Sequence, residues 1–167
     1  MKHKTKISLF PQSRETDIIC EHKDAMCNFD VSAVVSYRGE SPEKKNIYQD
    51  ILQTDDIEQA LLNSSGLVLC DNVNNFGKRA YLNRLQDTAN LNKIVYTSSY
   101  IYDWLGEEAF SRNEVVILNE NAEKRTYAKT SLYEINCPVI SILGLGENCD
   151  KLAILLSLRK KFSGRRV

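Results

Sequence analysis

The residues best suited to chemistry lie in a glycine-containing loop at residues 144–151. An apolar run at 138–143 predicts a strand before this loop, and a helix is expected to begin near Cys149 with Asn148 as its cap. Glycine lets backbone approach a ligand closely, and the N–H groups of a helix start attract anions. The candidate cofactor-binding residues, with phosphate or a nucleotide as ligand, are Gly144, Gly146, Glu147, Asn148 and Lys151.

Known phosphate-binding motifs match this loop only in part. If Lys151 were the lysine of a Walker A loop, Asp150 would replace its second glycine, Leu152 its Ser or Thr, and Leu145 its first glycine. The dinucleotide-binding G-x-G-x-x-G pattern also fails, since Cys149 stands at its third glycine. The sequence therefore predicts either a degenerate P-loop with weak anion affinity or a tight turn without a ligand.

Other kinds of reactive site find little support. There are two histidines, His3 and His22, and no G-x-S-x-G motif, so the sequence assigns no catalytic residue. Five cysteines form no C-x-x-C pair, which favours reduced thiols and gives no ligand spacing for a metal.

The elements that must position the loop alternate along the chain. Several of the apolar runs are continuous, as in strands buried on both faces of a parallel sheet, and amphipathic helical segments separate them. We therefore predict an α/β fold with an open, mostly parallel, doubly wound (Rossmann-like) sheet and helices on both faces. The expected strands are at 6–10, 31–37, 66–70, 93–97, 114–118 and 138–143, the first five in one sheet.

Particular residues should define the helices and the ligand-binding edge. Asp55 is expected to cap the second helix, and Leu82, Leu85, Trp104 and Leu105 to face the sheet. A first helix is expected at 13–28 and a third at 78–90, with a surface loop at 38–50. Ligands of such sheets bind beyond the carboxyl ends of the strands, which here are the loops at 11–14, 36–39, 71–77, 98–100 and 144–148.

The domain organisation divides near residue 136. Residues 1–136 are expected to form the Rossmann-like domain, and residues 137–167 to be the strand, loop and helix that open a second, truncated, P-loop-like domain or pack as part of the first. Gly164 is a good C-cap for that helix, close to the last residue.

Composition limits the partners. Lys and Arg number 22, as do Asp and Glu, so no global charge would attract nucleic acid or an anionic membrane. The sequence contains neither a signal peptide nor an apolar stretch of membrane-spanning length, and a cytoplasmic location is expected.

Two segments carry a family resemblance. "VSAVVSYRG" at 31–39 and "CPVISILGLGENCDKLAILLSLRKKF" at 137–162 resemble the peptide maturation system proteins of ribosomally made, modified bacterial peptides, including bacteriocins. The resemblance covers the N-terminal half of that family. It implies an accessory, non-catalytic role with a precursor peptide or maturation enzymes as partners, and a homo-oligomer is compatible with it. Two alternatives stay open: a nucleotide-dependent enzyme using the degenerate loop, and a regulatory module that binds a small ligand.

Overall fold

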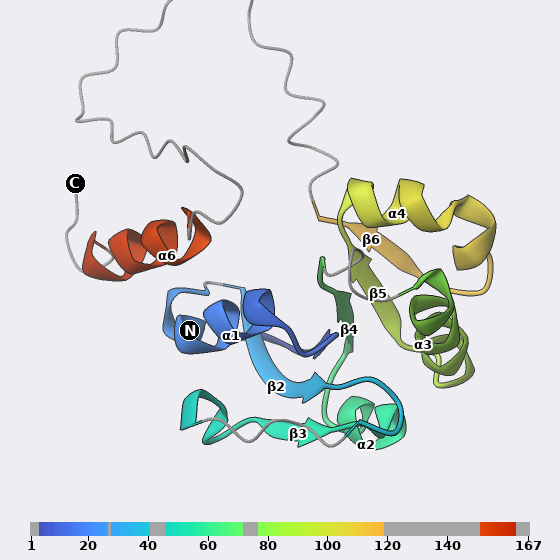
Figure 1. Ribbon diagram of the computed structural model, residues 1–167, viewed down its shortest axis with the longest axis horizontal. Coiled ribbons are helices and arrows are strands. Elements are labelled where there is room, and N and C mark those ends of the chain that lie inside the picture. Colours follow the sequence, from blue (N-terminus) through green and yellow to red (C-terminus); the bar gives the residue numbers. More distant parts are fainter. Residues whose placement is uncertain (1–3, 27, 41–45, 72–76, 119–150, 163–167) are drawn as a thin grey trace, which may run out of the picture.

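The sheet is open, and all of its strands are parallel. The computed structural model describes residues 4–26, 28–40, 46–71, 77–118 and 151–162 (Figure 1). Its strands are β1 (Thr5–Phe10), β2 (Phe29–Val35), β3 (Leu52–Thr54), β4 (Gly66–Leu69), β5 (Ile94–Thr97) and β6 (Val115–Ile117). They lie in the order β3-β2-β1-β4-β5-β6, which is the order of the Rossmann fold. The predicted fold class is confirmed.

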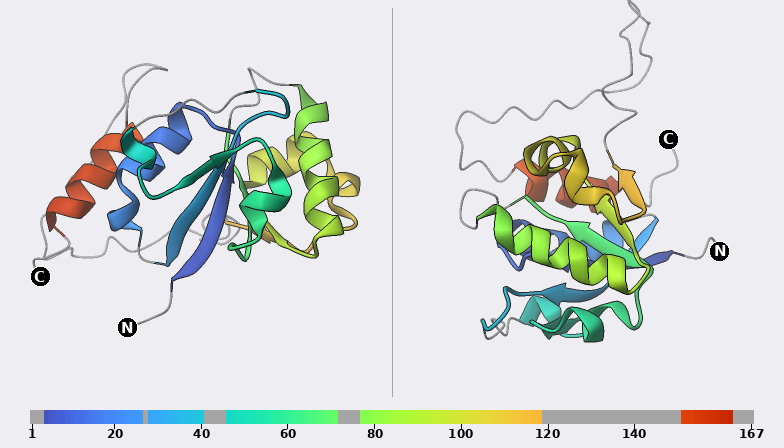
Figure 2. Two further views of the ribbon diagram at one scale, coloured as in Figure 1. Left: turned by 90° about the horizontal axis from the view of Figure 1, so that it is seen from below. Right: turned by 90° about the vertical axis from the view of Figure 1, so that its right-hand side faces the viewer.

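Helices cover both faces of this sheet (Figures 1 and 2). Buried side chains of α2 (Ile57–Leu61), α3 (Lys78–Asn90) and α4 (Ser99–Leu105) join one core cluster with η3 (Glu107–Phe110). On the other face, α1 (Arg14–Glu21) and η2 (Asn46–Tyr48) contribute to a second cluster. The connections from β1 to β3 run in one direction along the sheet, and those from β3 to β6 run in the other. Because each crossover is right-handed, the helices of these two sets lie on opposite faces. None of the described helices is long and apolar enough to cross a membrane.

The C-terminal helix α6 (Lys151–Phe162) lies beside α1 and η1 (Lys23–Ala25). Lys160 Nζ is 3.8 Å from a carboxylate oxygen of Asp24, and the Ser157 hydroxyl is 3.5 Å from the His22 ring. Both contacts are exposed, so they contribute little free energy. The expected strand at 138–143 lies outside the described residues.

Several sequence-based expectations need correction. The strand β3 was not predicted, because it has three residues and its Leu52 is exposed. Asp56, not Asp55, caps α2: its side chain accepts hydrogen bonds from the backbone N–H groups of Glu58 and Gln59. The first helix ends at Glu21 and only the 3-10 turn η1 follows it, so the predicted helix at 13–28 was too long.

The buried face of α3 differs from the predicted one by one residue. Leu85 is buried as expected, but Leu82 is 39% exposed, and the buried positions are Tyr81, Arg84, Leu85 and Thr88. These follow the i, i+3, i+4, i+7 spacing of one helical face. In α4, Leu105 is buried and Trp104 is half-buried against the same core, as predicted. The charged Arg84 therefore stands where the pattern of α3 calls for an apolar residue.

Two of the cysteines lie in the core behind α1. Cys20 and Cys70 are buried free thiols. Burial raises the pKa of Cys20 to about 12, and it also raises the pKa of Cys70. Both are therefore protonated packing groups, as free buried cysteines usually are.

The start of β4 requires glycine. A Cβ atom on Gly66 would lie 2.2 Å from the carbonyl oxygen of Ile94 and 2.9 Å from the Tyr96 ring. The Tyr96 ring, which lies beside Gly66, also packs against Phe29 of β2, and the two ring centroids are 5.7 Å apart.

We expect Gly66→Ala to lower the free energy of unfolding by about 3 kcal/mol, because backbone of the neighbouring strand must move to admit the methyl group. Gly77→Ala is the matched control, since no atom lies within 4 Å of a Cβ there, and its change should stay below about 1 kcal/mol. Urea unfolding measures both. Equal stabilities of the two variants would contradict the packing described for β4.

Candidate functional site

Only one of the predicted cofactor-binding residues falls in the described part of the chain. Gly144, Gly146, Glu147 and Asn148 lie outside it. Lys151 is the first residue of α6 and is exposed. The assignment of these residues to a phosphate or nucleotide stays a prediction.

The crevice where a Rossmann sheet usually binds its ligand lies between the carboxyl ends of β1 and β4. At this boundary a carboxylate oxygen of Glu15, in the first turn of α1, accepts a hydrogen bond of 2.8 Å from the backbone N–H of Asp71, just after β4. Ser13 caps the same helix in a capping box with Thr16. An anionic ligand entering this crevice would meet the negative charge of Glu15.

The environment of Glu15 disfavours its charge. Burial raises the pKa of its carboxyl above the usual 4.5; the hydrogen bond from Asp71 opposes this rise, and the negative charge of Asp71 adds to it. Asp71, the first residue of the loop expected at 71–77 to contact ligands, thus donates its backbone N–H to Glu15.

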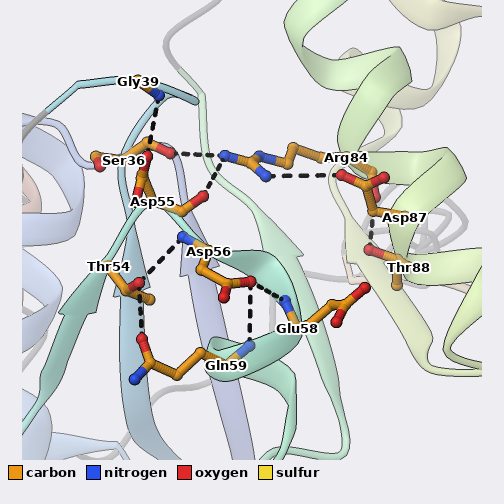
Figure 3. Close-up of polar contacts among 10 residues, drawn as sticks. All are labelled: Ser36, Gly39, Thr54, Asp55, Asp56, Glu58, Gln59, Arg84, Asp87 and Thr88. Atoms are coloured by element: carbon orange, nitrogen blue, oxygen red, sulfur yellow. Dashed lines mark hydrogen bonds and ion pairs between the residues drawn. The ribbon is translucent and has the colours of Figure 1, made fainter.

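A second location, at the carboxyl ends of β2 and β3, is organised by Arg84 (Figure 3). This side chain is 4% exposed. One terminal nitrogen donates to the backbone carbonyls of Ser36, at 3.1 Å, and Asp55, at 2.9 Å. The other lies 3.6 Å from a carboxylate oxygen of Asp87, one helical turn further along α3. Burial lowers the pKa of the guanidinium, and the charge of Asp87 opposes that shift; arginine remains charged in either case.

Further contacts hold the loops around Arg84. The guanidinium carbon lies 5.5 Å from the centre of the Phe10 ring, within the range of a cation–π interaction. Gly39 has a φ of +84°, which glycine adopts readily, and its N–H donates 3.0 Å to a carboxylate oxygen of Asp55. The ends of β2 and β3 are therefore connected both to each other and to α3.

Two hollows flank Arg84. We call the first, of about 360 Å³, the arginine cleft; its lining consists of Phe10, Tyr37, Arg38, Gly77, Arg79, Ala80, Asn83, Arg84 and Asp87. The second, of about 390 Å³, is the acidic hollow, lined by Arg38, Asp55, Asp56, Ile57, Glu58, Arg84 and Asp87. Both volumes are at the low end of the range for small-ligand sites.

Some charged side chains of the arginine cleft form ion pairs within the described chain, and others do not. Arg84 and Asp87 face each other. Arg38 and Arg79 are exposed, and neither forms an ion pair with another residue of the described chain. Arg38 follows β2, and Arg79 lies in the first turn of α3. The N-cap of this helix, Gly77, makes no side-chain hydrogen bond. The cleft can accept the negative charge of a ligand from two sides.

The sequence analysis predicted one loop of this site but not the residues that α3 contributes to it. Residues 36–39 were among the strand ends expected to contact ligands, and two of them, Tyr37 and Arg38, line the cleft. Arg79 and Arg84 were missed. The signal for Arg84 was its position among Tyr81, Leu85 and Thr88 on the buried face of α3. In the described residues, no group of three or more His, Cys, Asp or Glu side chains could hold a metal ion.

This geometry defines an α/β protein with a Rossmann-like parallel sheet, whose open cleft lies to one side of the usual crevice. Comparison with known proteins adds no closer class: the chain matches no protein-family model and none of the curated proteins searched.

We expect Arg84→Met to lower the free energy of unfolding by about 3 kcal/mol. The substitution keeps much of the side-chain volume but leaves two backbone carbonyls and Asp87 without their donor. Arg112→Met, at an exposed arginine whose contact with Asn90 is 3.5 Å long, should change stability by less than about 0.5 kcal/mol. Thermal or urea unfolding decides; a loss below 1 kcal/mol for Arg84→Met would refute the role assigned to it.

Glu15→Gln should show a pH-dependent effect. Because the folded-state pKa of Glu15 is raised, the folded protein binds a proton more tightly than the unfolded chain does, so its ionisation costs stability as pH rises above about 4.5. Relative to Glu15→Gln, the wild-type protein should therefore be less stable at pH 7 than at pH 4.5. Urea unfolding of both proteins at the two pH values tests this. A difference that does not change with pH would show that Glu15 is not desolvated.

Proposed function

We propose that the chain is an accessory protein in the maturation of a ribosomally synthesised bacterial peptide, and that it binds its partner without catalysing a reaction. The observation that carries this proposal is the location of Tyr37, Arg38 and Gly39. They end the segment "VSAVVSYRG", which resembles peptide maturation system proteins. In the structure Tyr37 and Arg38 line the arginine cleft, and Gly39 holds the adjoining loop through Asp55.

Two features support binding over catalysis. At the β1–β4 boundary the Glu15 carboxylate accepts a hydrogen bond from the backbone of Asp71, and two charged side chains that line the cleft, Arg84 and Asp87, are engaged with the protein itself. A precursor peptide is the natural partner for the two exposed arginines, and a maturation enzyme is the alternative partner that the resemblance implies.

Deletion of the gene in its source bacterium should abolish or strongly reduce the mature peptide, as measured by mass spectrometry of culture supernatant and cells. Wild-type protein supplied from a plasmid should restore it, whereas the double variant Arg38→Gln, Arg79→Gln should restore less than about a fifth of the product, because its two binding charges are lost. Arg112→Gln, outside the cleft, is the control and should restore it fully.

Unchanged peptide maturation after the deletion would contradict the proposal. The nucleotide-dependent alternative makes a separate prediction: micromolar binding of magnesium ATP or GTP that Lys151→Ala abolishes. Calorimetry on the full chain distinguishes the two hypotheses. Such binding would favour a nucleotide-dependent enzyme over an accessory protein.

A further inference from the structure

We propose that the arginine cleft binds a carboxylate group of a peptide, held between Arg38 and Arg79. This inference rests on the proposed function for the choice of a peptide as partner. The class of ligand follows from the charge, shape and lining of the cleft.

The first step concerns the sign of the ligand's charge. Arg38 and Arg79 are exposed and lack ion-pair partners in the described structure, while Asp87, which also lines the cleft, faces Arg84. A guanidinium presents paired N–H donors in a plane, which match the two oxygens of a carboxylate or two oxygens of a phosphate. The exposed guanidiniums of Arg38 and Arg79 therefore favour an anionic ligand.

Carboxylates near the arginines limit how much negative charge the ligand can carry. Four carboxylates and three guanidiniums line the cleft and the adjacent acidic hollow, which share Arg38, Arg84 and Asp87. A polyphosphate spreads its charges over several phosphate groups, so the groups beyond the arginine pair would extend toward Asp55, Asp56 and Glu58 in the acidic hollow and be repelled. A single carboxylate is small enough to stay beside the arginines. This balance favours a carboxylate monoanion over a nucleotide.

The apolar part of the lining indicates which kind of molecule carries the carboxylate. An aromatic side chain contributes to the lining of the cleft: Tyr37 is 8% exposed, and its ring centroid is 5.2 Å from that of the fully buried Phe10 behind it. Ala80 adds a further apolar surface, and the Asn83 amide adds a polar group beside it. Apolar atoms next to the acidic group would be accommodated there. A glutamate or aspartate beside an aliphatic residue, or an apolar C-terminal residue with its free carboxylate, has this chemistry.

The site is already shaped before a ligand arrives. Arg84 fixes the ends of β2 and β3 relative to α3 through its bonds to Ser36 and Asp55. Arg38 and Arg79 consequently extend from backbone that need not rearrange, which lowers the entropic cost of binding.

The experiment is a nuclear magnetic resonance titration of the full chain, following the arginine Nε–H signals. The probes are the acetylated, amidated peptide Ala-Leu-Glu-Leu-Ala, the same peptide with glutamine in place of glutamate, and the glutamine peptide with a free C-terminal carboxylate. Magnesium ATP and inorganic phosphate are titrated separately. The variants are Arg38→Gln and Arg79→Gln, with Arg112→Gln as the control, and thermal unfolding verifies that each variant is folded.

We expect the glutamate peptide to shift the Arg38 and Arg79 signals and the amidated glutamine peptide to leave them unchanged. Each cleft variant should weaken binding by at least about fivefold, while Arg112→Gln should not. Binding of the free C-terminus would identify a terminal carboxylate as the source; binding of the glutamate peptide alone would identify a side chain.

Equal binding of the glutamate and amidated glutamine peptides would overturn the inference, and so would tighter binding of ATP or phosphate at the same signals. The proposed function fails by a different result, namely unchanged peptide maturation after gene deletion. Carboxylate binding by the purified chain would survive that outcome.

Discussion

The arrangement of the carboxyl edge of this sheet depends on one buried cation, Arg84. Its guanidinium donates to backbone carbonyls at the ends of two strands, faces Asp87 on its own helix and lies over the Phe10 ring. A buried charge is costly unless it is paired and hydrogen-bonded, and this one meets both conditions. The loops after β2 and β3 are thereby held against α3, and the arginine cleft lies between them.

The same sheet treats its two ligand positions in opposite ways. At the boundary of β1 and β4, where Rossmann sheets usually bind ligands, Glu15 supplies the anion itself and accepts the N–H of Asp71. At the ends of β2 and β3, by contrast, two exposed arginines line an open cleft. The fold class predicts that ligands bind at the carboxyl edge of the sheet, and the charge distribution along that edge is the basis for proposing the arginine cleft.

The sequence predicted the fold better than the site, for physical reasons. Long apolar runs such as 31–37 mark strands buried on both faces, and β2 was found from its run. The strand β3 was missed because three residues with an exposed Leu52 form no such run. Arg38, Arg79 and Arg84 are separated by 41 and 5 residues along the chain, and only the fold, which brings the loop after β2 against Arg84 of α3, places them in one cleft. Leu82 was misplaced because the buried face of α3 includes Arg84, which hydropathy alone assigns to solvent.

We propose that the cleft held by Arg84 receives a carboxylate between two other arginines. The most direct measurement is a crystal structure of the chain grown with a glutamate-containing peptide. It should show a carboxylate in contact with Arg38 and Arg79 while Arg84 keeps its bonds to the carbonyls of Ser36 and Asp55. A peptide bound elsewhere, or an Arg84 side chain turned from those carbonyls toward the ligand, would contradict the account.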